Sequence, residues 1–213
     1  MTAEQIITKF ELRVDDTTEL STDDELELLN EHYQLLADKR PWEILKKEAS
    51  GVMVSTTEIG DAPSDFKFLV ENRNYTDNSI ENEDNSRPVG ILINASTTPK
   101  WLRVINWGDR RQYTNSDGFA YYDPTDNKFK TTYPQPTGAT YSYDYKSKPA
   151  PLLINDSPVF PEEYHQVLAL MMAVDDMSIQ LFDKARSYAR ENEARITDYL
   201  QRMAMWNANL LNM

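Results

Sequence analysis

The segment from Pro161 to Met213 constrains the fold most, because it carries the longest uninterrupted helical pattern in the sequence. Neither proline nor glycine occurs between Glu162 and Met213. Apolar and small residues follow one another at alternating steps of three and four, which is typical of a narrow helix face packed against one neighbouring helix. This face, here called the seam, consists of Phe182, Ala185, Ala189, Asn192, Ile196, Tyr199, Met203 and Trp206.

A continuous helix from Ile179 to Trp206 would be roughly 40 Å long at about 1.5 Å per residue. A helix of that length projects from a small domain or is shared between subunits. The seam therefore fits either a helical hairpin within one chain or a coil between chains. The hairpin is favoured, because the pattern covers only about three and a half heptads. Asn192 is the one polar member of the seam.

The sequence before residue 50 predicts three short helices. Thr2 to Val14 has apolar residues at helical spacing, and Thr22 to Glu25 reads as a capping box that opens a second helix. Arg40-Pro41 ends the second helix, because the residue before a proline avoids the helical conformation. A third helix is expected from Pro41 to about Ala49, since proline is tolerated at the first helical position. Trp42 and Leu45 would face inward from it as core anchors of the helical part.

After Gly51 the composition changes to aromatic and β-branched residues that alternate with polar ones between frequent turns, which indicates a β region. Residues 72 to 86 are rich in Asn, Asp, Glu and Ser and predict an exposed, mobile loop. The strands are expected at Val52–Thr56, Val89–Asn94, Lys100–Trp107, Gly118–Tyr122, Lys128–Thr132 and Ala139–Tyr145, with an irregular segment at Pro63–Asn72.

These patterns predict an α+β protein in which the N- and C-terminal helices form a helical bundle and an antiparallel β domain is inserted between them. The expected boundaries are 1–50 for the N-terminal helices, 51–150 for the β domain, and 151–213 for the long C-terminal helices with a docking tail.

Composition excludes several classes of function. The chain has no cysteine and two histidines, so neither a disulfide framework nor a zinc site is expected. No glycine-rich phosphate loop or G-x-S-x-G nucleophile motif occurs, so we expect no cofactor, no metal and no catalytic residue. No apolar stretch is long enough to cross a membrane. The net charge of −13 argues against tight binding of duplex DNA, although an acidic wall beside passing DNA is compatible with it.

Tyrosine and phenylalanine are frequent between residues 113 and 145. Such a run could stack sugars, but at alternate positions on strands it more often forms a sheet face or a protein interface. This leaves a second interpretation open, in which the chain is a tail or baseplate protein whose tyrosine-rich β module binds carbohydrate or protein. The residues are Tyr113, Phe119, Tyr121, Tyr122, Phe129, Tyr133, Tyr141, Tyr143 and Tyr145.

Two stretches resemble the head-to-tail adaptor (connector, or head completion) proteins of tailed bacteriophages. The first runs from Leu20 to Asn30 and on to Pro41–Ala49. The second comprises Tyr143–Lys146 with Pro149 and Leu152, followed by Pro161–His165, which opens the last helical region. Together they cover about half of the sequence, and the order of helices, β insertion and helices agrees with that family.

The resemblance implies a structural virion protein and not an enzyme. Such proteins form a homo-oligomeric ring, commonly of twelve copies, below the portal protein. The ring extends the DNA channel without binding DNA specifically, and it presents a platform to the next neck or tail protein. Location at the head-tail junction of a virion, after assembly in the cytoplasm of a bacterial host, is implied as well.

The last residues of the sequence are a candidate docking tail for such a partner. Beyond Trp206, the segment Asn207 to Met213 contains three large apolar residues that continue no upstream stripe. They either reach a partner or fold back on the subunit's own core. The expected partner interface, with the portal as the partner, consists of Met203, Trp206, Leu210, Leu211 and Met213.

Overall fold

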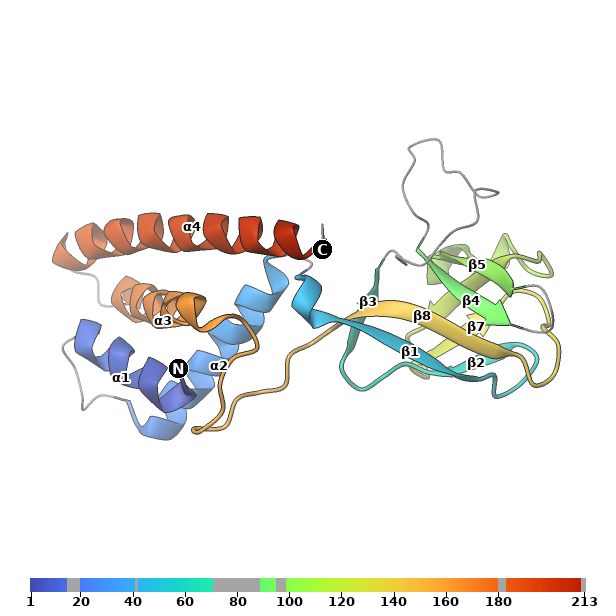
Figure 1. Cartoon of the computed structure of the whole chain (residues 1–213), viewed down its shortest axis with the longest axis horizontal. Helices are drawn as coiled ribbons and strands as arrows, with labels where there is room; N and C mark the ends of the chain where they lie inside the picture. Colours follow the sequence, from blue (N-terminus) through green and yellow to red (C-terminus); the bar gives the residue numbers. More distant parts are fainter. Residues whose placement is uncertain (15–19, 41, 71–88, 95–98, 180–182, 212–213) are drawn as a thin grey trace. The chain divides into compact units, whose positions relative to one another are not determined.

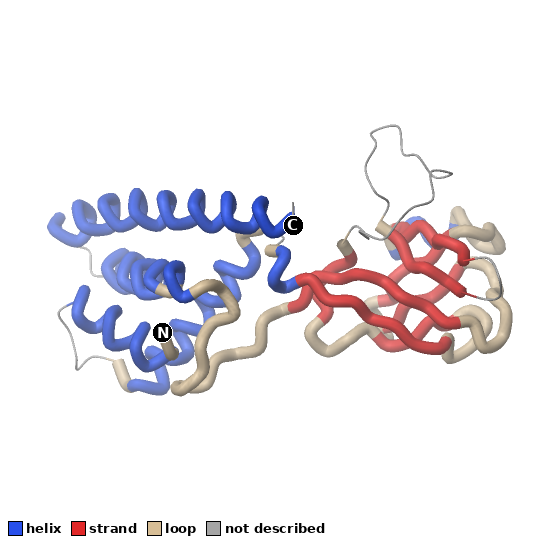
Figure 2. Tube along the Cα trace, in the orientation of Figure 1, coloured by secondary structure: helices blue, strands red, loops and turns tan. Residues whose placement is uncertain are grey.

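The computed structural model describes residues 1–14, 20–40, 42–70, 89–94, 99–179 and 183–211 (Figure 1). For residues 177–179, 183–189 and 211 it describes the backbone only. The chain divides into two compact units, one formed by Met1–Leu45 with Lys148–Met213 and the other by Lys46–Ser147. Helices make up the first unit and strands the second (Figure 2).

The helical unit is arranged around α3, which every other long helix of the unit contacts. Residues Val167 to Leu170 of α3 are all buried, so this helix is apolar on nearly every side and needs neighbours all round. In Figure 1, α4 runs alongside α3. The elements are α1 (Ala3–Val14), α2 (Thr22–Asp38), α3 (Gln166–Ile179) and α4 (Asp183–Leu211), with 3-10 turns η1 (Glu43–Leu45) and η4 (Glu162–Tyr164).

The start of α2 is a capping box one residue earlier than the sequence indicated. Ser21, and not Thr22, is the N-cap, and its hydroxyl accepts a hydrogen bond from the Asp24 backbone N–H at 3.2 Å. The Asp24 carboxylate accepts in return from the Ser21 backbone N–H. The hydrogen bond from the Ser21 side chain lowers the pKa of Asp24, which favours its charged form at the positive end of the helix.

One polar face of α2 holds the chain as it returns from the sheet. The Asn30 side chain donates to the Leu152 carbonyl at 3.0 Å and accepts from the Leu152 N–H at 2.6 Å. Gln34 donates to the Pro149 carbonyl, and the Tyr33 hydroxyl accepts from the Val159 N–H. These bonds satisfy backbone groups of a segment that belongs to no helix or strand.

The β unit is an eight-stranded, nearly closed barrel-like sheet in the order β1-β8-β4-β5-β6-β7-β2, with β3 also paired to β8. All pairs are antiparallel except β5 with β6, which are parallel. The strands are β1 (Lys46–Val52), β2 (Glu58–Asp61), β3 (Phe66–Leu69), β4 (Gly90–Asn94), β5 (Pro99–Ile105), β6 (Phe119–Asp123), β7 (Lys128–Thr131) and β8 (Thr140–Ser147). A short 3-10 turn, η3 (Trp107–Arg111), follows β5.

The predicted fold class, a helical bundle with an inserted antiparallel β domain, is therefore wrong. The protein is a mixed α/β protein in which the strands build a barrel-like sheet, and that sheet is mixed. Spacing along the sequence reports which segments are extended, but it does not report which segment each strand pairs with. The parallel pair joins Arg103 to Phe119 and Ile105 to Tyr121, with η3 lying in the connection between the two strands.

The largest local error concerns the predicted helix from Pro41 to Ala49. Only η1 is helical there, and Lys46 already begins β1, which pairs with β8 from Lys146 to Thr140. Lys-Lys-Glu-Ala favours a helix in isolation, and pairing with a distant strand overrides that preference. The predicted strand at Val52–Thr56 falls mostly between β1 and β2, and the segment at Pro63–Asn72 contains β3.

The remaining strand predictions match β4 to β8 to within two residues. The turn between β6 and β7 is closed by Asn127, whose φ of 59° is in the left-handed region that asparagine tolerates. The predicted mobile loop at 72–86 lies outside the described residues. Where a continuous helix was predicted from Ile179, α3 ends at Ile179 and α4 begins at Asp183, and residues 180–182 lie outside the described residues.

Most of the aromatic run fills the barrel. Tyr143 is 1% exposed and Phe129 is fully buried, and their ring centroids are 4.8 Å apart. Phe66 packs edge-on against Phe129 at 5.3 Å. Burial raises the pKa of Tyr143, so its hydroxyl stays protonated. These side chains form a core, and a core is not accessible to a sugar.

Candidate functional site

The seam of α4 packs against the helices of its own subunit over the part that the structure describes. Asn192 and Met203 are fully buried, and Ile196 and Trp206 are partly buried against the core. The Tyr199 hydroxyl donates to the side-chain carbonyl of Gln166 at 3.2 Å, near the start of α3. Of the other predicted seam residues, Ala185 and Ala189 are described by their backbone alone, and Phe182 lies outside the described residues.

The end of α4 is joined to η1. Asn207 is 9% exposed, and its side-chain oxygen accepts a hydrogen bond from the Glu43 backbone N–H at 2.6 Å. Trp42 and Leu45, on either side of that backbone group, are buried in the helical core. Beyond Asn207, Leu210 is partly exposed. The side chain of Leu211 and the whole of Met213, both predicted to form the partner interface, are outside the described atoms.

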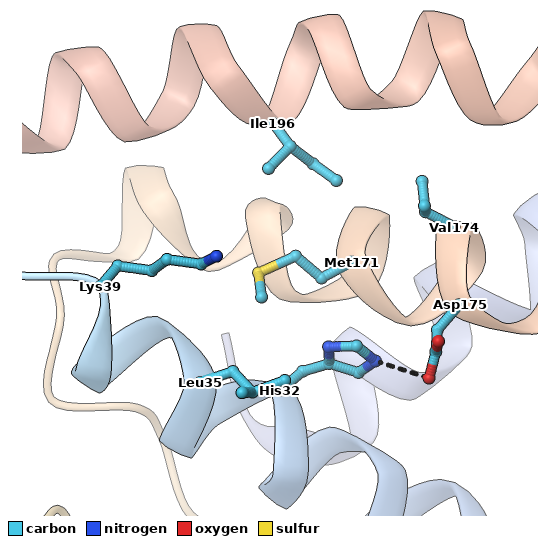
Figure 3. A pocket seen from close by; sticks show the side chains of 7 residues that line it. All are labelled: His32, Leu35, Lys39, Met171, Val174, Asp175 and Ile196. Atoms are coloured by element: carbon cyan, nitrogen blue, oxygen red, sulfur yellow. Dashed lines mark ion pairs between the residues drawn. The ribbon is translucent and has the colours of Figure 1, made fainter.

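A hollow opens on the helical unit where α2, α3 and α4 meet (Figure 3). Its volume is about 220 Å³. Apolar side chains make most of its wall, with Lys39 and Asp175 as its charged members. The lining residues are His32, Leu35 and Lys39 from α2, Met171, Val174 and Asp175 from α3, and Ile196 from α4.

His32 is the buried polar group of this hollow, with 7% of its surface exposed. Its Nε2 lies 3.5 Å from Oδ2 of Asp175, as the dashed line in Figure 3 marks. Neither ring nitrogen of His32 makes a hydrogen bond of normal geometry with any described residue. Burial lowers the pKa of His32 more than the nearby Asp175 and Glu31 carboxylates raise it. The imidazole is therefore neutral near pH 7.

An acidic groove lies beside the hollow and shares Asp175 with it. Its volume is about 280 Å³. Five carboxylates and two leucines line it, which gives a surface that is negative but has an apolar floor. The residues are Leu20, which precedes α2, then Asp24, Glu27, Leu28 and Glu31 from α2, and Asp175 and Asp176 from α3.

The sequence indicated these acids only as neighbouring pairs. Asp23-Asp24 and Asp175-Asp176 are adjacent along helices, and adjacent residues point apart. Packing of α2 on α3 brings Asp24 and Asp175 into one groove although they are far apart in the chain. The available signal was the spacing of Asp24, Glu27 and Glu31, which places three acids on one face of α2. Within the described residues, no group of His, Asp and Glu is arranged to hold a metal ion.

His165 is the other buried histidine of the chain. Its Nε2 donates to the Phe160 carbonyl at 2.6 Å, and its Nδ1 lies 3.2 Å from the Met1 ammonium. Burial lowers its pKa, as for His32. With 3% of its surface exposed, His165 joins the first residues to η4, and it lines neither the hollow nor the acidic groove.

We expect these two histidines to make the folded state less stable in mild acid. The unfolded chain binds protons at histidine below a pKa of about 6.5, while both buried histidines resist protonation because their pKa is lowered. Stability from this source is complete above pH 6.5 and is lost as the pH falls toward the folded-state pKa. Thermal melts at pH 7.5 and 5.0 should show a smaller decrease in Tm for His32→Gln than for the unchanged protein. Equal decreases would contradict the assignment.

We expect replacement of Asn192 by leucine to stabilise the folded protein. Both polar atoms of the Asn192 side chain are buried and have no hydrogen-bond partner among the described residues. Leucine has a similar shape and removes that unsatisfied amide, so Asn192→Leu should raise the free energy of unfolding by about 1–3 kcal/mol. Asn207→Leu is the matched control on the same helix. Asn207 has a partner in the Glu43 N–H, so its replacement should lower stability. Chemical denaturation of both variants checks the pair, and destabilisation by both would refute the first expectation.

Within the described residues, no helix combines the length and the apolar character that a membrane span requires. A sequence profile described as SU10 adaptor protein matches residues 1–212, which include both structural units. A search of curated proteins gave no match.

Proposed function

The chain belongs to the SU10 adaptor protein family, a family of phage head-tail adaptors, and we propose that it forms a ring below the portal that joins the capsid to the neck or tail. The members of this family are structural proteins of the virion. The observation that carries the proposal is the extent of the match, from residue 1 to residue 212. The helices and the barrel-like sheet therefore both belong to the adaptor.

In this proposal the last turn of α4 reaches the portal. The seam up to Trp206 and Asn207 is used within the subunit, so these residues position the end of the helix. Leu210 follows them and is partly exposed. Leu211 and Met213 continue the same segment and supply further apolar side chains. About twelve such segments would hold a ring to the portal through many weak contacts.

The charge of the chain supports the passage of DNA through the ring without binding. A net charge of −13 repels the phosphate backbone, and counterion release needs clustered cations. We propose that the ring extends the channel in this way and offers its other face to the next neck or tail protein.

The second function considered, a carbohydrate-binding tail module, loses three of its nine candidate residues to the core. Tyr143, Tyr145 and Phe129 are buried in the barrel core. Tyr133 is 44% exposed and lies outside the strands. Because the buried rings serve the core of the barrel, no feature of the structure favours sugar binding over packing, and we do not propose it.

Mixing the purified protein with an isolated portal ring tests the proposal. We expect saturation at about twelve copies for each portal, the number of copies that the resemblance to head-to-tail adaptors implies. Native mass measurement of the complex gives the number of copies, and electron microscopy gives their position. A saturated complex with one or two copies, or no complex at all, would contradict the adaptor ring.

A further inference from the structure

The hollow and the acidic groove form one continuous surface, because Asp175 lines both. We call it the α2–α3 surface. It offers an apolar hole next to a row of carboxylates, and Leu35 at the edge of the hole is 51% exposed. A ligand for this surface needs an apolar side chain for the hollow and cations for the groove. Duplex DNA is excluded by its charge.

This chain contains a segment with that chemistry. Between residues 99 and 112 it has four basic residues (Lys100, Arg103, Arg110 and Arg111) and one acidic residue (Asp109), although acids outnumber bases in the whole sequence. The turn η3 forms the C-terminal part of this segment. Two of the four tryptophans of the chain, Trp101 and Trp107, also lie here.

The geometry of η3 places an aromatic ring and cations side by side. Trp107 is 37% exposed, and the guanidinium of Arg110 lies 3.6 Å from the centroid of its ring. Arg110 also donates to the Trp107 carbonyl at 2.7 Å, which fixes the pair. Arg111 is exposed next to them. We call Trp107, Arg110 and Arg111 the η3 tip.

We infer that the η3 tip of one copy binds the α2–α3 surface of a second copy. Trp107 would enter the hollow, and Arg110 and Arg111 would face Glu27 and Glu31 in the groove. Asp109 of the tip gives Lys39, at the edge of the hollow, an acidic counterpart. The inference rests on the proposed function, because it assigns the contact by which neighbouring copies of the ring recognise one another.

A contact between two different surfaces is the type that closes a ring. Each copy has one α2–α3 surface and one η3 tip, so copies join head to tail until the rotation closes. Charge complementarity also explains how chains with a net charge of −13 can associate at all. The local pairing of arginine with glutamate offsets the repulsion between the remaining acids.

Reversing the charges on either side tests the contact. The first variant carries Glu27→Arg and Glu31→Arg, and the second carries Arg110→Glu and Arg111→Glu. Glu27 and Glu31 are exposed, so the first variant should fold normally. Because Arg110 contacts Trp107, Arg111→Glu alone is the substitute if the second variant melts early. A control with Glu4→Arg and Glu193→Arg makes the same change of net charge as the first variant, at exposed sites that do not line the α2–α3 surface.

Sedimentation velocity at low salt, over rising protein concentration, measures self-association. We expect each variant alone to associate at least about tenfold more weakly than the unchanged protein. An equimolar mixture of the two variants should recover association. A tip and a surface from different variants carry opposite charges, either both native or both reversed. The control should associate like the unchanged protein.

Three outcomes would overturn the inference. These are unchanged association of either variant, failure of the mixture while both variants are folded, and an unchanged protein that stays monomeric up to hundreds of micromolar. Portal capture is measured separately for the same proteins. If the unchanged protein saturates the portal at about twelve copies and the first variant binds it only as single copies, the proposed function stands and the contact between copies is lost. If the unchanged protein does not saturate the portal, the proposed function itself fails, so the two failures are distinguishable.

Discussion

Replacing Trp42 by alanine is expected to lower the free energy of unfolding by about 3–5 kcal/mol. The Trp42 side chain is fully buried, and its ring packs edge-on against Phe160 with centroids 5.5 Å apart. Its indole N–H donates to the Leu36 carbonyl at 2.8 Å, near the end of α2. Removal therefore leaves a large cavity and also deprives the Leu36 carbonyl of one of its hydrogen bonds, which leaves it the bond from the Lys39 N–H at 3.3 Å.

Two further substitutions separate these contributions. Trp42→Phe keeps most of the packing and removes the hydrogen bond, so it should cost about 1–2 kcal/mol. Met205→Ala is the surface control, because Met205 is 63% exposed, and its effect should stay within about 0.5 kcal/mol. Denaturant titration followed by circular dichroism gives all three values. A Trp42→Ala protein as stable as the unchanged protein would refute the role of Trp42 in the core.

The sequence predicted the long helices well because their signals are local. The buried stripe of α1 and the acidic first turn of α2 lie within a few residues of the elements they define. The capping box was identified one residue too late because Ser21 and Thr22 are both good caps, and only the backbone conformation of Ser21 distinguishes them. The capping residues therefore predict the start of α2 to within one residue.

Features that depend on contacts between distant segments could not be predicted in the same way. Lys46 to Val52 becomes a strand because β8, almost a hundred residues later, pairs with it. The alternation of apolar and polar residues in β5 and β6 does not indicate that these two strands pair in parallel. The acidic groove joins Asp24 of α2 to Asp175 of α3 across the helical unit. Each of these depends on packing that the spacing of residues does not describe.

Removing Asn209–Met213 is expected to abolish capture by the portal and to leave the fold intact. The cut is placed after Ala208 so that Asn207 keeps its hydrogen bond to the Glu43 N–H, on which η1 depends. The segment removed includes Leu210, Leu211 and Met213. If each apolar side chain contributes about 2 kcal/mol on burial, a ring of these segments loses a large multivalent contact.

The matched control is Leu12→Ser, which removes an apolar side chain that is 78% exposed on α1. It should leave both Tm and portal capture unchanged, which shows that loss of surface apolar area is not sufficient. Pull-down on immobilised portal rings measures capture, and a thermal melt of the same sample measures folding. A truncated protein that still binds the portal would refute docking by this segment. A decrease of several degrees in Tm would instead show that the segment packs on the subunit's own core, because a cost of about 1 kcal/mol shifts Tm by roughly 2–4 °C in a chain of this size.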